Sequence, residues 1–213
     1  MSRIIVLGAG GNAGRAIVAA ALARGHEVTA FLRDPAKART ATHTVQGDIT
    51  DPASVADAVA GHDVAVSSVY TPDVDPTEFY TAAADALIAA APARLIHVTL
   101  GTLLETEPGV RLLDAPDFPD EYKAFSLGHA AGLARIAEST LDWTAVSPTT
   151  DFDRESDPVG SARAATIADL GVKPFTEAYA SAPKITYADF GTGILDEIEN
   201  PGHRKVHFGL IAG

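Results

Sequence analysis

Residues 8–14, which read Gly-Ala-Gly-Gly-Asn-Ala-Gly, carry the clearest chemical signal in the sequence. They follow an apolar run of strand length, Arg3–Leu7, and precede an alanine-rich stretch with a helical pattern. Glycines allow a strand to turn sharply into a helix, and they allow backbone N–H groups to approach a pyrophosphate closely. A glycine turn in this place is typical of a dinucleotide-binding βαβ unit.

The glycines of this turn fit two registers. Gly8, Gly10 and Ala13 match the GxGxxG/A fingerprint, whereas Gly8, Gly11 and Gly14 match a GxxGxxG pattern. In both registers a larger side chain would block the approach of the phosphates to the backbone. The predicted phosphate-binding residues are Gly8, Gly10, Gly11, Asn12, where the helix is expected to begin, and Ala13.

Arg33 follows a second apolar run, Glu27–Leu32, and bears on the choice of nicotinamide cofactor. An NAD-specific site usually has an acidic residue at this strand end, where it holds the ribose hydroxyls, whereas a basic residue suits a 2′-phosphate. Lys37 and Arg39 add further positive charge. We therefore expect NADP(H) rather than NAD(H). Two alternatives remain: Asp34 acts as the ribose carboxylate, or Arg33 is merely solvated.

Strand and helix patterns alternate along the rest of the chain. This alternation predicts an α/β fold, a Rossmann-type doubly wound parallel sheet with right-handed crossovers. We expect a single domain, with residues 1–148 as its core and residues 149–213 as a small C-terminal lobe that faces the substrate. Residues 100–120 show no clear period and are expected to cover the site. After the first helix, the predicted strands cover residues 27–32, 42–46, 63–67, 94–98, 141–147 and 205–208. Pro148 is expected to end the strand at 141–147. The predicted helices cover residues 51–59, 77–90, 121–139 and 187–199.

Ligands of an open parallel sheet lie beyond the carboxyl ends of its strands. These strand ends add six cofactor-binding candidates. Asp48 also fits a role in capping or in a turn, and the serines also fit tight packing. The candidates are Asp48 and Ile49 near the adenine, Ser67, Ser68 and Val69 along the middle of the dinucleotide, and Thr99 after the fifth strand.

The 213-residue chain has no cysteine, a net charge of −12 and 46% hydrophobic residues. The lack of cysteine excludes disulfides, thiolate metal sites and thiol redox chemistry. The seven histidines have no metal-ligand spacing, so we expect no bound metal. No cluster of Lys and Arg suits nucleic acid, and no apolar run is long enough to span a membrane. The simplest expectation is a cytoplasmic protein without a leader segment, monomeric or homodimeric.

No tyrosine is followed by lysine at the fourth position, so the Tyr-x-x-x-Lys motif of typical short-chain dehydrogenases is absent. In that motif lysine lowers the pKa of tyrosine, which then protonates a carbonyl oxygen. A carbonyl reductase of the usual kind is therefore not expected. The candidate catalytic residues near the nicotinamide are Thr102, Tyr122 and Lys123, and the alternative for the last two is the first turn of a solvated helix.

Several segments carry a family resemblance over nearly the whole chain. The glycine turn and residues 32–35, 47–49 and 63–68 resemble the atypical short-chain dehydrogenase/reductases. The more specific resemblance is to the NADH-flavin reductase group, which is related to the biliverdin IXβ reductases and to NmrA-like proteins. It rests on residues 116–123, 141–144, 147–148, 185–190 and 196–203.

This resemblance implies hydride transfer from a reduced nicotinamide to a flavin or another planar acceptor, which is a small-molecule substrate rather than a prosthetic group. Such a transfer needs no side-chain acid, because the hydride goes directly to the ring and solvent can supply the proton. The alternative is a non-catalytic NADP-binding sensor of NmrA type with a protein partner. The chain departs from the group at Leu103, where a serine is expected, and in residues 149–183, which lack a glycine-rich pattern.

Overall fold

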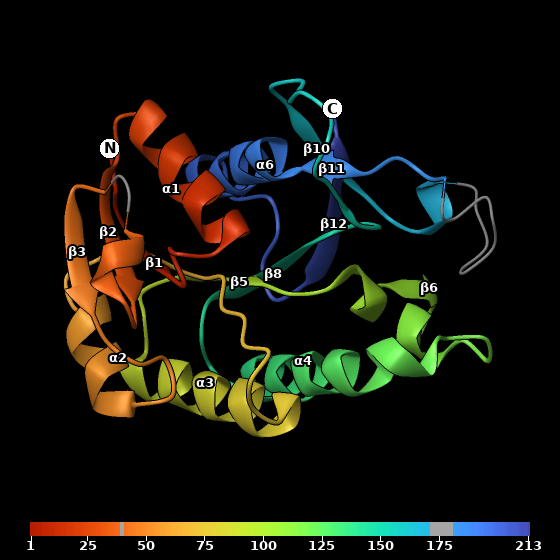
Figure 1. Ribbon diagram of the computed structural model, residues 1–213, viewed down its shortest axis with the longest axis horizontal. Coiled ribbons are helices and arrows are strands. Elements are labelled where there is room, and N and C mark those ends of the chain that lie inside the picture. Colours follow the sequence, from red (N-terminus) through yellow and green to blue (C-terminus); the bar gives the residue numbers. More distant parts are fainter. Residues whose placement is uncertain (39–40, 171–180) are drawn as a thin grey trace.

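The computed structural model describes residues 1–38, 41–170 and 181–213. Its centre is an eight-stranded sheet in the order β10-β12-β8-β5-β4-β1-β2-β3 (Figure 1). Neighbouring strands are parallel, except that β10 pairs antiparallel with β12 at one edge. The strands are β1 (Arg3–Leu7), β2 (Glu27–Leu32), β3 (His43–Gln46), β4 (Val64–Ser67), β5 (Leu95–Val98), β8 (Trp143–Pro148), β10 (Ala162–Ala165) and β12 (His207–Ala212).

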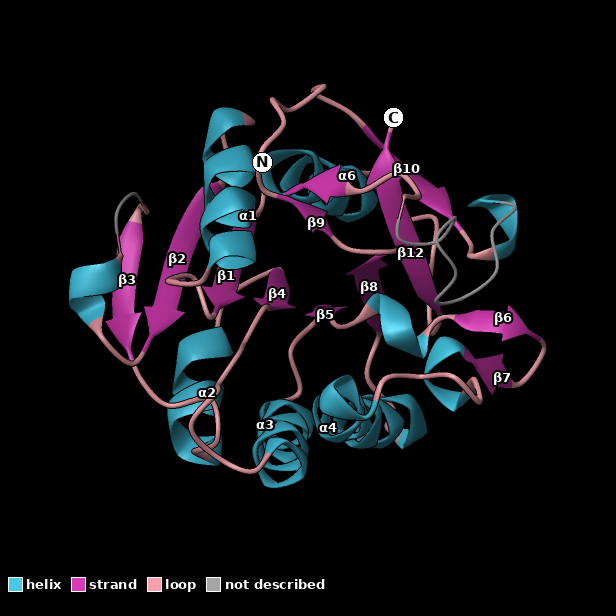
Figure 2. Ribbon diagram, turned by 45° about the vertical axis from the view of Figure 1, so that its right-hand side comes forward, coloured by secondary structure: helices cyan, strands magenta, loops and turns pink. Residues whose placement is uncertain are grey.

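Helices cover both faces of this sheet (Figure 2). On one face lie α1 (Asn12–Ala23) and α6 (Tyr187–Glu199). On the other face lie α2 (Pro52–Val59), α3 (Pro76–Ala90) and α4 (Asp120–Glu138). This is the doubly wound Rossmann-type α/β fold that the sequence predicts, so the predicted fold class is confirmed.

Local chemistry fixes where the helices α2 and α3 begin. Asp51 Oδ1 accepts a hydrogen bond from Ala53 N at 3.0 Å, and Asp75 Oδ1 accepts one from Glu78 N at 3.0 Å. A proline follows each of these aspartates, and its missing N–H costs little in the first turn, where N–H groups have no intrahelical acceptor. Both helices therefore begin within one residue of the predicted positions.

Two buried clusters form the core, one on each face of the sheet. The first includes Ile4, Val6 and Ile96 with Ile17 of α1 and Phe190 of α6. The second joins the opposite side chains of the same strands to α2, α3 and α4. Because both faces are covered, the central strands consist mainly of apolar residues on both sides, as parallel strands in such folds do. None of the helices in the described residues is long and apolar enough to cross a membrane.

The last strand differs from its prediction. The sequence suggests residues 205–208, whereas β12 covers His207–Ala212. Its extra length comes from neighbours on both sides, β8 and β10, which no local pattern reveals. By contrast, β8 ends at Pro148, where the sequence predicts its end. Pro148 lies opposite Leu210, and Thr149 N donates to Leu210 O at 3.0 Å.

The two segments without a clear period contain short strands. Residues 100–120 form a hairpin of β6 (Glu105–Glu107) and β7 (Val110–Arg111), flanked by two 3₁₀ turns. Residues 149–183 contribute β10 and β9 (Phe152–Asp153), which pairs with β11 (Ile185–Thr186), while residues 171–180 lie outside the described part of the chain. The predicted C-terminal lobe thus adds α6, β12 and β10 to the main layers.

Candidate functional site

The glycine turn after β1 is wedged between backbone segments. Gly8 has φ of +88°, and a Cβ built on it would lie 2.2 Å from Ser68 O. A Cβ on Gly14 would lie 2.2 Å from Gly8 O, so helix α1 packs directly on the turn. The close helix–strand contact is thus made by Gly14, as the GxxGxxG register predicts, whereas Ala13 is half-buried in the first helical turn.

Gly11 differs from these two glycines. It is exposed, its φ is −75°, and a Cβ built on it would meet a single neighbour, Gly8 O, at an ordinary 3.5 Å. No contact within the described protein therefore requires glycine at this position. Space at Gly11 suits the close approach of a ligand to the backbone.

The N-terminus of α1 is prepared for an anion. The first N–H groups of a helix have no intrahelical acceptor and carry partial positive charge. Helices α2, α3 and α6 have a capping side chain, and α4 has Asp120 and Glu121 in its first turn. Among the α-helices in the described residues, α1 alone has neither a side-chain cap nor an acid there. This terminus and the open Gly11 fit a pyrophosphate.

Arg15 and Lys37 contact the glycine turn, and Arg33 follows β2; these three residues are here called the basic cluster. Arg15 Nη1 donates to Gly10 O at 2.8 Å, and a Cβ built on Gly10 would meet Lys37 Cβ at 3.3 Å. All three cations are exposed, and none forms an ion pair with a carboxylate of the described residues. Arg39 lies outside the described residues. Arg15 Nη2 also donates to Asn12 Oδ1 at 2.6 Å, so the positive charge of the cluster is held beside the turn without a neutralising carboxylate among the described residues.

Two nearby aspartates have local partners. Asp34 Oδ1 accepts from Ala36 N at 3.1 Å and caps the 3₁₀ turn Pro35–Lys37. Asp48 Oδ1 accepts from Thr50 N and from Thr50 Oγ1, and these bonds, the backbone one first, lower the pKa of Asp48. Arg33 adds to this lowering, so it lies within electrostatic range of Asp48. Asp48 thus makes the contacts expected of a turn residue, which was the alternative to adenine binding. Ile49 is buried in the core.

The middle of the predicted cofactor groove combines half-buried and buried residues. Ser68 and Val69 are half-buried, and Ser68 contacts the glycine turn through its carbonyl. Ser67 and Thr99 are 0% and 3% exposed, so their side chains lie beneath the carboxyl edge. Side chains this buried do not reach a ligand, so Ser67 and Thr99 support the carboxyl edge from below.

The three catalytic candidates lie around the start of α4. Thr102 Oγ1 lies 3.0 Å from Ser126 Oγ, one helical turn after Tyr122 on the same face of α4. Tyr122 and Lys123 are exposed in the first turn. A hydrogen bond with Glu121 is the main cause that raises the pKa of Tyr122, which makes it a weaker acid than a free tyrosine. Their catalytic roles remain predictions.

A set of rings behind this edge was not predicted from the sequence. Tyr70, Tyr80, Phe125 and His129, here called the aromatic wall, contact one another in succession. His129 Nδ1 lies 3.4 Å from Thr99 Oγ1, so the wall ends beside strand β5. The signal available in the sequence was the four-residue spacing from Phe125 to His129, which places both rings on one face of α4.

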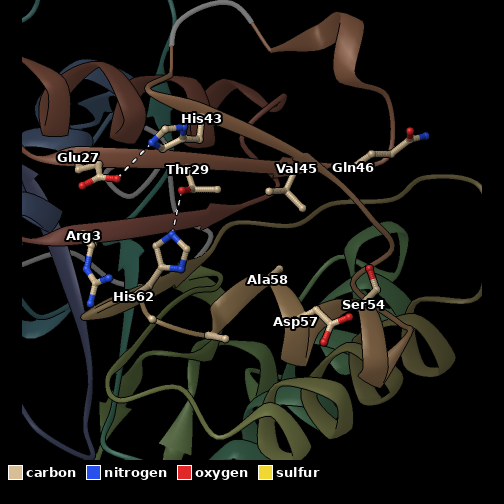
Figure 3. A pocket seen from close by; sticks show the side chains of 12 residues that line it. Arg3, Glu27, Thr29, His43, Val45, Gln46, Ser54, Asp57, Ala58 and His62 are labelled. Atoms are coloured by element: carbon tan, nitrogen blue, oxygen red, sulfur yellow. Dashed lines mark hydrogen bonds and ion pairs between the residues drawn. The ribbon is translucent and has the colours of Figure 1, made fainter.

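A cavity of about 540 Å³ lies away from this site, between β2, β3 and helix α2 (Figure 3). It extends to Arg3 and Glu27 at the amino ends of the strands. Within it, His62 Nε2 lies 2.8 Å from Thr29 Oγ1 and His43 Nε2 lies 3.2 Å from Glu27 Oε1. None of the predicted site residues lines this cavity, so the candidate site rests on the carboxyl edge of the sheet.

Two buried histidines, His97 and His129, and the half-buried His207 lie on the α4 side of the sheet and predict acid sensitivity. Burial lowers the pKa of His97 to about 4, of His129 to about 3 and of His207 to about 4. Below pH 6.5 these imidazoles bind protons in the unfolded chain but stay neutral in the folded protein. The free energy of unfolding should therefore fall as the pH falls from 6.5 towards 4. Each histidine adds a slope of up to about 1.4 kcal/mol per pH unit.

Urea unfolding at a series of pH values measures this slope. His97→Met removes a buried imidazole whose two nitrogens have no hydrogen-bond partner among the described residues, so it should flatten the dependence. His43→Gln, at an exposed position, is the control and should leave the slope unchanged. An unaltered slope in His97→Met would contradict this account.

A pair of glycine variants separates ligand binding from folding. Gly11→Val should keep the fold, because the position has room, and should lose NADPH binding. Gly14→Ala should lower the free energy of unfolding by about 1–3 kcal/mol through overpacking against Gly8 O. The measurements are urea unfolding without ligand and NADPH titration by fluorescence. Wild-type NADPH affinity in folded Gly11→Val would show that the phosphates bind elsewhere.

Comparisons with known proteins agree with this geometry. Residues 8–171 match the family model described as NAD(P)H-binding. YwnB of Bacillus subtilis (strain 168) is 29% identical over 218 residues, which cover 99% of this chain and 98% of that protein. The solved structure of a putative NADH-flavin reductase from Streptococcus pneumoniae TIGR4 is 29% identical, covers 100% of both chains and has a TM-score of 0.83.

A more distant structure, the anaerobillin reductase ChuY from Escherichia coli O157:H7, is 17% identical. It covers 99% of this chain and 97% of that chain with a TM-score of 0.74, which shows a common fold. The resemblance drawn from the sequence is thereby confirmed, and the chain belongs to the NAD(P)H-binding family.

Proposed function

We propose that this protein is an NADPH-dependent reductase that transfers hydride to a flavin or a similar planar acceptor. The observation that carries the proposal is the N-terminus of α1, uncapped and without an acid in its first turn, next to the open Gly11. The name of the pneumococcal relative, a putative NADH-flavin reductase, supports the reaction class. A small-molecule acceptor is accordingly the proposed partner.

The basic cluster supports NADPH over NADH. A 2′-phosphate adds negative charge to the adenosine ribose, and Arg33 follows β2, where this ribose binds in such folds. Asp34 is engaged in capping its own 3₁₀ turn, which disfavours its alternative role as ribose carboxylate. Arg15 and Lys37 both contact Gly10 and add positive charge beside the glycine turn.

In this proposal the residues of the chain bind the cofactor and orient it towards the acceptor. Bound NADPH supplies the hydride. The amides at the start of α1 would hold the pyrophosphate, and the buried Ser67 and Thr99 would support the edge of the sheet beneath the cofactor. The sequence contains no Tyr-x-x-x-Lys pair that could supply a proton. Solvent therefore supplies the proton, and catalysis rests on proximity and orientation.

The Arg33→Ala variant tests cofactor choice. A charge-assisted hydrogen bond contributes about 1.5–3 kcal/mol, so the Kd of NADPH should rise about ten- to a hundredfold while that of NADH stays nearly constant. Arg135→Ala in the last turn of α4 is the matched control and should change neither. If wild type binds both cofactors equally, Arg33 does not read the phosphate and Asp34 becomes the residue to test.

NADPH oxidation, followed by absorbance with FMN, FAD, riboflavin and simple quinones in turn, tests the reaction. We expect turnover with at least one flavin. Tyr122→Phe and Lys123→Ala should lower the rate by less than about tenfold, well short of the 10²–10⁴-fold typical of a lost general acid. Tight NADPH binding without turnover on any acceptor would reject the reductase and favour the non-catalytic sensor.

A further inference from the structure

Two aromatic rings are strongly exposed in the part of the chain that the structure describes. Tyr70 is 64% exposed and Tyr122 is 55% exposed. Tyr70 lies three residues after β4, and Tyr122 lies in the first turn of α4, so both lie at the carboxyl edge of the sheet. Exposure of an aromatic ring to water is unfavourable compared with its burial. An exposed ring beside a ligand site is suited to stacking on a planar ligand.

Neighbouring rings hold Tyr70 while leaving most of it exposed. Its ring meets Phe125 edge-to-face, with centroids 5.6 Å apart and an interplanar angle of 71°. Phe125 packs in the same way on Tyr80 at 5.9 Å and on His129 at 4.8 Å. The exposed ring is thus the outer end of the aromatic wall and has a rigid support behind it. Such a ring loses little conformational freedom when a planar ligand binds.

The strand order indicates which half of a bound dinucleotide lies near Tyr70. Arg33 and Asp48 follow β2 and β3, on one side of β1 and its glycine turn. Tyr70 and Thr99 follow β4 and β5, on the other side. A dinucleotide whose pyrophosphate lies at the turn has its adenosine on the first side and its nicotinamide on the second. Tyr70 therefore lies in the half of the groove where hydride leaves the cofactor.

We infer that Tyr70 is a specificity-determining residue on which the ring of the acceptor stacks, and that it selects planar aromatic acceptors. The inference rests on the proposed function for the identity of that ring as a flavin. The segment Ser68–Tyr70 links this contact to the glycine turn, because Ser68 O lies against Gly8. The same short segment thus contacts the phosphate-binding turn and carries the stacking ring.

The test uses FMN as the probe and direct binding as the readout. FMN is titrated into the protein saturated with NADP⁺, and quenching of FMN fluorescence gives its Kd. Tyr70→Leu, which keeps bulk but removes the ring, should raise the Kd about tenfold or more, since stacking on an aromatic side chain contributes on this scale. Tyr70→Phe should stay within about twofold of wild type. Val74→Ala, at an exposed apolar position in the same connection, should change nothing.

Each other outcome has a defined meaning. An unchanged FMN Kd in Tyr70→Leu, or an equal loss in Tyr70→Phe, would overturn the stacking role. A rise in the Kd of NADPH without a rise in that of FMN would assign the ring to the cofactor and would also overturn it. Tyr70-dependent FMN binding without NADPH oxidation would reject the proposed reductase while the stacking role stands.

Discussion

The structure depends on the close approach of three backbone segments at the carboxyl end of β1. Gly8 turns with φ of +88° between Ser68 and helix α1, and Gly14 brings the helix onto the turn. At 2.2 Å from a carbonyl oxygen, a Cβ at either glycine would push these segments apart. This contact fixes the direction of α1, so the same steric constraint that packs the helix also presents its uncapped N–H groups at the edge of the sheet.

Charge is distributed unevenly around this contact. The chain has a net charge of −12, yet Arg15, Arg33 and Lys37 gather at the turn without ion pairs in the described residues. Several other cations are paired, as in the buried Arg94–Glu197 contact at 2.7 Å. Unpaired cations next to a helix N-terminus repel one another and the helix dipole, so their arrangement favours an anionic ligand.

Small residues on α4 position the opposite side of the groove. A Cβ on Gly128 would lie 2.6 Å from Pro76, and one on Gly132 would lie 2.8 Å from Tyr80 O. The absence of side chains at these glycines lets α3 and α4 pack closely. The ring centroids of Tyr80 and His129 therefore lie only 3.7 Å apart. The aromatic wall is therefore a product of helix packing.

The sequence by itself determined the features that depend on neighbours along the chain: the glycine turn, the starts of α2 and α3 to within one residue, the alternation of strands and helices, and Arg33 at the end of β2. It left open which glycine packs, because Gly14 meets Gly8 only once α1 lies on β1. It also missed the length of β12, the hairpin in residues 100–120 and the aromatic wall, since these form through strand pairing and helix packing between distant segments. Tertiary structure alone decided these features, because a ladder partner or a ring contact has no signature in the local spacing of residues.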